Sequence, residues 1–380
     1  MIILEKPFVS NELKNYLAGT QTALLDNNFA RQNLAGTSVN FIDENTARER
    51  IKAGERVYTI SENALDWVCK NTSDKNCLRV IETMKNKAAM RELLKNVYPN
   101  FFFKSVPASE LGKIDFSTLP VPVILKPTVG FFSVGVYTIQ NENDWQNALA
   151  DIEKTSANWR ELYPENVLGN NNFIIEKYIT GDEYAVDVYF DDCGNAVVLN
   201  ILKHDFASAS DVSDRLYYTS AKILRERLAE FTDFFNKINS KLGARNFPTH
   251  VELRVENGEI IPIEFNPMRF AGWCCTDVAF FAFGVRTYDY FLNNKKPDWE
   301  QLLAGKENKI YTMIVLNKPV PEPKFNNFNY DALCAKFENV LCLRKMNFRE
   351  LSIFGFLYTE TQNPRELEFI VNSDLTEFCE

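Results

Sequence analysis

The chain has 380 residues, 46% of them hydrophobic, which is enough to bury a sizeable core and suggests two or three domains. Its formal net charge is −9 and its lysines and arginines are not clustered, so no nucleic-acid partner is expected. It contains neither a run of about twenty apolar residues nor a signal-peptide pattern, so we expect a soluble, cytoplasmic protein without a membrane segment.

Histidine and cysteine usage limits the chemistry further. The eight cysteines form no CxxC pair, which favours reduced cytosolic thiols over a zinc site or a disulfide framework. The two histidines, His204 and His250, are too few for a histidine-rich metal centre, and we do not expect a histidine-based nucleophile triad. Any catalysis must therefore use Asp, Glu, Lys, Arg and backbone groups.

The first hundred residues alternate short apolar runs such as "MIIL", "TALL" and "VNFI" with polar helical stretches. This alternation predicts a small α/β layer with a parallel sheet. None of these runs is followed by GxGxxG, which argues against a dinucleotide site. A helix is expected to start at "NKAAMRELLKNV", with Asn86 as its N-cap.

The rest of the chain is richer in strands. "VPVILKPTVGFFSVGVYTI" predicts strand, glycine-containing loop and strand, "NFIIEKYITGDEYAVDVYF" predicts two strands around a short link, and "AVVLNIL" continues the sheet. A long helix is expected from about Ser213 to Leu242, ended by Gly243. After Lys306, strands including "IYTMIVL" and "ELEFIVN" around the helix-like "YDALCAKFENV" predict a small closing domain.

A β-hairpin is predicted by "HVELRVENGEIIPIEFNP". To place the apolar residues of both strands on one face, we expect an odd-length turn, for instance at residues 256–258. The apolar set comprises Val251, Leu253, Val255, Ile261, Ile263 and Phe265. The opposite face would then carry Glu252, Arg254, Glu264 and Asn266.

The two carboxylates of this hairpin, Glu252 and Glu264, would lie opposite or diagonal to each other. At about 5 Å and an effective dielectric near 20 they repel by roughly 3 kcal/mol, so a cation should sit between them. Oxygen ligands without histidine or cysteine favour Mg²⁺ or Mn²⁺. A solvated sheet face is the alternative interpretation.

Lys126 ends an apolar strand before Pro127, where a phosphate is a natural partner for its ammonium. The following loop, residues 128–135, contains two glycines and Ser133, so its amides could approach phosphate oxygens, although an ordinary turn would look the same. Glu183 begins the strand after the link and could accept both hydroxyls of a ribose, or could be an exposed edge-strand charge. Lys87, near a helix start, would by itself be read as a solvated lysine.

In this order, Lys87, "LKPTVGFFSVGV", "EKYITGDE", "HVELRV" and "IEFNPMRFAG" resemble the motifs of the ATP-grasp superfamily, specifically its carboxylate-amine ligase-like members. The resemblance covers about half the chain, from Lys87 to Gly272. In "NPMR" the arginine is one position later than in the commonest "NPR" form.

The resemblance implies a role for each matching residue. Lys87 and Lys126 would contact phosphates, which the amides around Ser133 would cover. Glu176, Lys177 and Ile179 would frame adenine and Glu183 the ribose of ATP. One or two Mg²⁺ (or Mn²⁺) ions would be held by Glu252, Glu264 and Asn266. Arg254 and Arg269 would bind the substrate carboxylate and a tetrahedral oxyanion, and Lys203 would add a phosphate or substrate contact.

The fold class implied is α+β or α/β. An N-terminal Rossmann-like pre-ATP-grasp domain (1–100) would precede the ATP-grasp domain (101–306, with a hinge near 176–183) and a small C-terminal α+β closing domain (307–380).

The function implied is an ATP- and Mg²⁺-dependent ligase that joins a small carboxylate to an amine or a thiol through an acyl phosphate, on amino-acid or peptide-like substrates. A kinase or phosphotransferase acting on a carboxylate, and a non-catalytic nucleotide-binding protein, remain alternatives. A homodimer is expected only by analogy.

Overall fold

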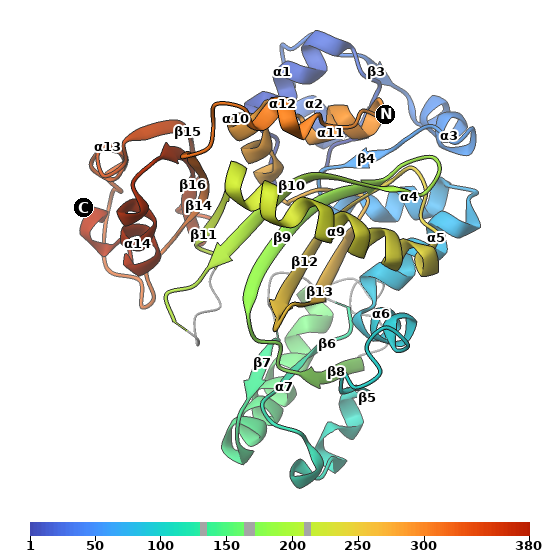
Figure 1. Ribbon diagram of the computed structural model, residues 1–380, viewed down its shortest axis with the longest axis vertical. Coiled ribbons are helices and arrows are strands. Elements are labelled where there is room, and N and C mark those ends of the chain that lie inside the picture. Colours follow the sequence, from blue (N-terminus) through green and yellow to red (C-terminus); the bar gives the residue numbers. More distant parts are fainter. Residues whose placement is uncertain (130–134, 163–171, 209–213) are drawn as a thin grey trace.

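The computed structural model describes residues 1–129, 135–162, 172–208 and 214–380. Its described strands form three sheets, ordered β3-β2-β1-β4, β5-β8-β6-β7 and β13-β12-β9-β10-β11-β14-β16-β15. Figure 1 shows strands β9, β10, β12 and β13 of the eight-stranded sheet at the centre, the N-terminal elements above them, the β5–β8 sheet below them, and β14–β16 with the other C-terminal elements to one side. The molecule is thus built around one large antiparallel sheet.

The N-terminal sheet is parallel, as predicted for the first hundred residues. Its strands are β1 (Ile2–Ile3), β2 (Leu24–Leu25), β3 (Phe41–Ile42) and β4 (Tyr58–Thr59). Between them run α1 (Asn11–Thr20), α2 (Asn28–Asn33) and α3 (Glu44–Lys52). The side chains of Ser10, Asn27 and Asp43 cap these helices by accepting hydrogen bonds from backbone amides of the first turn. Helices α4 (Leu65–Asn71), α5 (Lys75–Lys85) and α6 (Lys87–Leu94) then lead to the second sheet.

The second sheet is antiparallel and buries one of its faces against a helix. Its strands are β5 (Phe103–Pro107), β6 (Val123–Pro127), β7 (Tyr137–Ile139) and β8 (Asn172–Lys177), and the helix is α7 (Glu142–Leu162). Leu125 and Ile175 pack with Trp145 of α7. Because side chains alternate along a strand, Lys126 and Glu176 lie on the opposite face.

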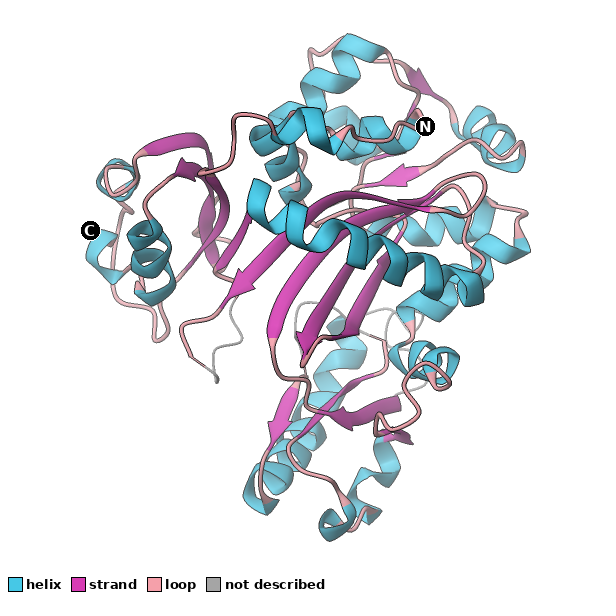
Figure 2. Ribbon diagram, viewed as in Figure 1, coloured by secondary structure: helices cyan, strands magenta, loops and turns pink. Residues whose placement is uncertain are grey.

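The eight-stranded sheet is antiparallel throughout. Its strands are β9 (Asp182–Phe190), β10 (Ala196–Asp205), β11 (Leu216–Ser220), β12 (Phe247–Glu256), β13 (Glu259–Pro267), β14 (Ile310–Asn317), β15 (Asn339–Lys345) and β16 (Ile353–Thr361). Helix α9 (Ala221–Leu242) lies across one face of this sheet (Figure 2) and buries Phe231 and Phe235 there. On the other face Val278, of α10 (Val278–Phe283), packs with Ala185 and Leu202. Short helices α11 (Thr287–Leu292) and α12 (Trp299–Leu303) follow.

The predicted start of the long helix and the predicted strand at "ELEFIVN" are wrong. The long helix begins at Ala221, capped by Ser220, because the preceding aromatic and β-branched run is strand β11; the expected start at Ser213 lies outside the described residues. "ELEFIVN" belongs to helix α14 (Pro364–Asn372), because the Asn363 side chain caps the helix and Pro364 stands in its first turn.

Other predictions in the C-terminal region are confirmed wholly or in part. "IYTMIVL" is strand β14, while the helix-like stretch from Tyr330 forms only α13 (Tyr330–Cys334) before β15 begins. Strands β14, β15 and β16 extend the sheet that contains β9–β13. The boundaries 1–100, 101–306 and 307–380 stay predictions.

Gly181, in the link between β8 and β9, is required by both its backbone and its surroundings. It has a φ of +90°, and an added Cβ would lie 2.1 Å from the carbonyl oxygen of Val255. We expect Gly181→Ala to lower the melting midpoint by at least several degrees, since left-handed strain and a backbone clash each cost about 1–3 kcal/mol. Gly305→Ala is the control, because that residue has a φ of +75° and nothing within 4 Å of the added Cβ. Equal midpoints for the two variants would show that the clash is relieved at no cost.

Candidate functional site

The β12–β13 hairpin places two carboxylates face to face. Its turn has two residues, Asn257 (φ +53°) and Gly258 (φ +82°), so the odd-length turn expected from the sequence is wrong. Asn-Gly with both φ values positive suits the twist of a two-residue hairpin. A bulge between Glu252 and Leu253 changes the register once more, so that Glu252 pairs with Glu264 as predicted.

Between the turn and the bulge, the predicted apolar face is not kept. Ile261 lies opposite Arg254 instead of sharing the face of Val255, which pairs with Ile260. Beyond the bulge, Val251 pairs with Phe265 as expected. The bulge therefore corrects the register only where the carboxylates lie.

The two carboxylates differ electrostatically. Burial, followed by the charges of Glu264, Glu183 and Asp214, raises the pKa of Glu252 well above its ordinary value. Among the residues that the structure describes, the Glu252 carboxylate makes no hydrogen bond or ion pair. Burial would also raise the pKa of Glu264, but Lys87, Lys126 and Arg269 outweigh that effect and hold it below the ordinary value.

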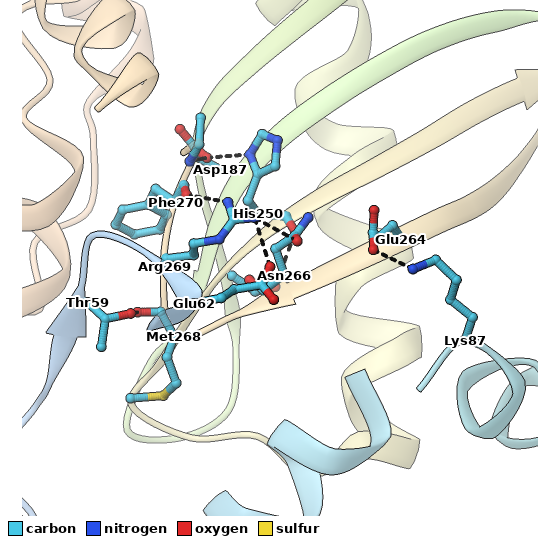
Figure 3. Close-up of polar contacts among 12 residues, drawn as sticks. Thr59, Glu62, Lys87, Asp187, His250, Glu264, Asn266, Met268, Arg269 and Phe270 are labelled. Carbon is cyan, nitrogen blue, oxygen red and sulfur yellow. Dashed lines mark hydrogen bonds and ion pairs between the residues drawn. The ribbon is translucent and has the colours of Figure 1, made fainter. Parts of the chain in front are cut away.

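These carboxylates fit a divalent cation. Asn266, the third predicted ligand, is buried two residues after Glu264, and its Oδ1 accepts a hydrogen bond of 2.7 Å from Arg269 (Figure 3). A carboxylate without a partner among the described residues, a second carboxylate opposite it and an amide oxygen form the hard-oxygen donor set that Mg²⁺ or Mn²⁺ binds.

Lys87 reaches this hairpin from the start of α6. The side chain of Asn86 accepts hydrogen bonds from the amides of Ala88 and Ala89, confirming the predicted N-cap. The Nζ of Lys87 lies 2.6 Å from Oε1 of Glu264 (Figure 3), and its side chain is only 12% exposed, so the solvated-lysine interpretation is wrong. Burial lowers the pKa of Lys87, but Glu264 and the neighbouring carboxylates more than reverse this.

Lys126 has a protein partner. Its Nζ lies 2.7 Å from Oε1 of Glu176, and Nε of Arg91 lies 2.6 Å from Oε2 of the same carboxylate. Burial lowers the pKa of Lys126 despite this partner. Burial would raise the pKa of Glu176, yet Lys126 and Arg91 bring it down to about 2. The loop residue Ser133 lies outside the described residues.

The link after β8 is attached to the hairpin by polar contacts. Nζ of Lys177 lies 2.5 Å from Oε2 of Glu256, whose Oε1 accepts a hydrogen bond of 2.8 Å from the amide of Thr180. The carbonyl of Ile179 accepts a hydrogen bond of 2.5 Å from Nη1 of Arg254. The link that was expected to frame adenine is therefore fixed to β12.

Glu183 is not an edge-strand charge, because β9 lies between β12 and β10. Its carboxylate is 2.9 Å from Nε of Arg254 and 3.1 Å from Nδ1 of His204. Burial raises the pKa of Glu183, but hydrogen bonds and charge from His204 and Arg254 lower it below its usual range. Arg254 thus shares the face of Glu252 and is held by Glu183.

Arg269 reaches the site despite its shifted position in "NPMR". The additional residue, Met268, has a φ of +63°, and Nη2 of Arg269 returns to within 2.7 Å of Asn266 Oδ1 and 3.0 Å of Glu62 Oε1. The left-handed backbone of Met268 therefore offsets the one-residue displacement of Arg269, whose side chain lies beside Asn266 and Glu62 (Figure 3).

Lys203 does not join the other residues. It pairs with Tyr184 across β9–β10, whereas its neighbour His204 pairs with Glu183. Because paired residues share a face and neighbours alternate, Lys203 lies on the face opposite Glu252 and Glu264. Its Nζ lies 3.3 Å from Asp182 and 3.7 Å from Asp205.

Three residues of the site were not predicted. Arg91 follows Lys87 by four positions on α6, so helical periodicity could have indicated it. Glu256 ends β12, two positions after Arg254, whereas the sequence analysis places it in the turn and predicts no contact for its side chain. Glu62 is more than two hundred residues from Arg269, and no local pattern links them.

Comparisons with known proteins bear on the family and the fold of this chain. Residues 119–277 match the family model described as the ATP-grasp domain. The alanine–anticapsin ligase of Bacillus subtilis strain 168 is 25% identical over 214 residues, which are 54% of this chain and 42% of that protein. The chain thus spans less than half the length of the curated relative it matches.

Two solved structures resemble nearly the whole chain. The L-amino acid ligase from Bacillus licheniformis has a TM-score of 0.72 at 18% identity, with 100% of this chain and 97% of that chain covered. The N5-carboxyaminoimidazole synthetase from Staphylococcus aureus, complexed with ADP, has a TM-score of 0.63 at 15% identity, with 98% of this chain and 96% of that chain covered. At these identities the likeness shows the fold. None of the described helices has an apolar stretch long enough to cross a bilayer.

Replacing Glu252 by Gln should stabilise the metal-free protein at neutral pH. Because its pKa is raised on folding, the carboxyl destabilises the fold as pH rises above the ordinary glutamate pKa near 4.3. At pH 7 we expect Glu252→Gln to have a free energy of unfolding that is larger by roughly 1 kcal/mol or more, and therefore a higher melting midpoint. This stabilisation should disappear below about pH 4.

Glu256→Gln is the matched control with the opposite sign. Burial would raise the pKa of Glu256, but Lys177 and Thr180 lower it to about 2, so its carboxylate stabilises the fold above about pH 4 and this effect is lost as pH falls toward 2. That variant should therefore melt lower than the wild type at pH 7. Thermal melts of both variants from pH 3 to pH 8 in EDTA would check the pair, and a lower midpoint for Glu252→Gln at pH 7 would contradict the electrostatic assignment.

Proposed function

The chain has the ATP-grasp fold and contains an ATP-grasp domain, and from this premise we propose that it is an ATP- and Mg²⁺-dependent ligase that joins a carboxylate to an amine. The observation that carries the proposal is the pairing of Glu252 with Glu264 on adjoining strands, with the Lys87 ammonium 2.6 Å from Glu264. This arrangement suits a metal-bound triphosphate, because it brings anionic metal ligands and phosphate-binding cations together.

The proposal assigns roles to several of the predicted site residues. Lys87 and Lys126 contact phosphate oxygens of ATP, and Glu252, Glu264 and Asn266 hold the metal. When bound, the metal supplies positive charge that neutralises the phosphates during transfer. Arg269 lies beside Asn266 and offers its positive charge to the substrate carboxylate.

The reaction proceeds in two displacements. The substrate carboxylate attacks the γ-phosphorus in line, so that a C–O–P linkage forms and ADP leaves. The amine then attacks the acyl carbon, inorganic phosphate leaves and an amide bond forms. Arg269, which lies 2.7 Å from the predicted metal ligand Asn266, is the first candidate to stabilise the tetrahedral oxyanion, and Arg254, held by Glu183, is the second. Lys203 is given no role, since it lies on the other face of the sheet.

Small amino-acid or peptide-like substrates are part of this proposal. The similar proteins include an L-amino acid ligase and an alanine–anticapsin ligase. A cytoplasmic location is also proposed, with which the eight free cysteines are compatible. A homodimer remains an expectation from analogy.

A substrate screen tests the reaction class. The protein with ATP and Mg²⁺ should release phosphate only when both a carboxylate and an amine partner are supplied, and mass spectrometry should find their amide. Pairs of proteinogenic amino acids are the first set to try. Phosphate transfer to a carboxylate without condensation would instead indicate a kinase, and ATP binding without turnover for any pair would indicate a nucleotide-binding protein.

Glu264→Gln should abolish Mg²⁺-dependent ATP turnover while leaving the fold intact, because it removes a metal-binding charge but keeps the side-chain shape. We expect turnover to fall by at least about a hundredfold. Glu259→Gln, an exposed position on the same strand, is the control and should keep the wild-type rate. Wild-type turnover by Glu264→Gln would rule out the metal assignment.

A further inference from the structure

The Glu176 carboxylate binds one buried cation through each of its oxygens. Lys126 approaches Oε1 at 2.7 Å and Arg91 approaches Oε2 at 2.6 Å, and the three side chains are only 3–6% exposed. One carboxylate therefore faces two cations in a region from which water is largely excluded. Such a group carries a surplus positive charge, which is unusual in a protein interior.

Arg91 is rigidly placed in this group. It lies one helical turn after Lys87 on α6, so both side chains leave the same side of the helix. Its guanidinium stacks over the ring of Phe101, with Cζ 4.3 Å from the ring centroid. Its Nη2 is buried and has no hydrogen-bond partner among the described residues.

We propose that Arg91 is a positioning residue for phosphate binding, which keeps Glu176 paired when Lys126 moves from that carboxylate to a phosphate of ATP. This inference rests on the proposed function. Lys126 is already bonded to Glu176, so it must give up that bond in order to bind a phosphate. Arg91 cannot make the same movement, because its guanidinium is held by Phe101 and Glu176.

The cost of leaving a buried charge unpaired favours an arrangement in which Arg91 stays bound to Glu176 while Lys126 moves to a phosphate. Removing the only partner of a buried ion is strongly unfavourable, because an uncompensated charge remains in the interior. With Arg91 in place, Glu176 keeps a charged hydrogen-bond donor after Lys126 leaves. Without Arg91, the same movement would leave Glu176 unpaired, so Lys126 would stay bound to it and be lost to the nucleotide.

Nucleotide binding by four proteins tests this proposal without knowledge of the substrates. The dissociation constant of a non-hydrolysable ATP analogue with Mg²⁺ is measured by calorimetry for the wild type, Arg91→Met, Glu176→Gln and the double variant. We expect Arg91→Met to bind at least about tenfold more weakly than the wild type. In the double variant the neutral Gln no longer retains Lys126, so binding should recover to within about threefold of Glu176→Gln.

This recovery separates positioning from a purely structural role. Loss of Arg91 is expected to lower the melting midpoint in both backgrounds, but a structural defect alone would weaken nucleotide binding equally with Glu or Gln at position 176. Arg91→Lys should restore part of the affinity, since it keeps a cation near Glu176. Arg225→Met, at an exposed ion pair on α9, is the control and should bind as the wild type does.

The outcomes are distinct. If the wild type binds the analogue and Arg91→Met binds it equally well, or if the double variant is as weak as Arg91→Met, the positioning role is wrong while the proposed function stands. If the wild type binds no adenine nucleotide, the proposed function fails and this inference fails with it.

Discussion

The site depends on carboxylates that are kept ionised in a partly dehydrated region by cations from other segments. Glu264 on β13 is held by Lys87 from α6, and Glu176 on β8 is held by Lys126 from β6 and Arg91 from α6. Buried carboxylates without such partners have raised pKa values, as Glu252 illustrates. Helix α6, the small sheet and the hairpin are thus joined by charge, and in the proposed function a triphosphate and a metal would use the same charges.

The polar contacts of the link after β8 complement these pairs. Glu256 at the tip of the hairpin binds Lys177 and Thr180, and Arg254 binds the carbonyl of Ile179, so the link follows the end of β12 closely. The absence of a side chain at Gly181 allows the link to approach the Val255 carbonyl. The positions of the small sheet and of the hairpin are therefore coupled through a few hydrogen bonds.

Much of the fold and part of the site could be predicted from local pattern. Parallel order in the first hundred residues, the Asn86 cap and the facing pair Glu252–Glu264 follow from periodicity and turn chemistry. The two-residue turn with its compensating bulge could not be distinguished from a three-residue turn, because both arrangements place Glu252 and Glu264 on the same face of the hairpin. The face of Lys203 required the register of β9 and β10, and Glu62 is brought to Arg269 only by tertiary structure. "ELEFIVN" was misread because its apolar residues fit a strand about as well as a short helix.

The placement of α6 bears on how this chain could be divided. Lys87 and Arg91 precede the boundary expected at residue 100, yet their ionic partners Glu264 and Glu176 follow it. If the chain were expressed as two fragments divided at that boundary, each fragment would carry unpaired charged side chains on the surface that contacts the other. These opposite charges would favour reassociation of the fragments, with an affinity that falls as the salt concentration rises. A cut made upstream of α5 would keep every one of these pairs in a single fragment, so it is the more sensible place to divide the polypeptide.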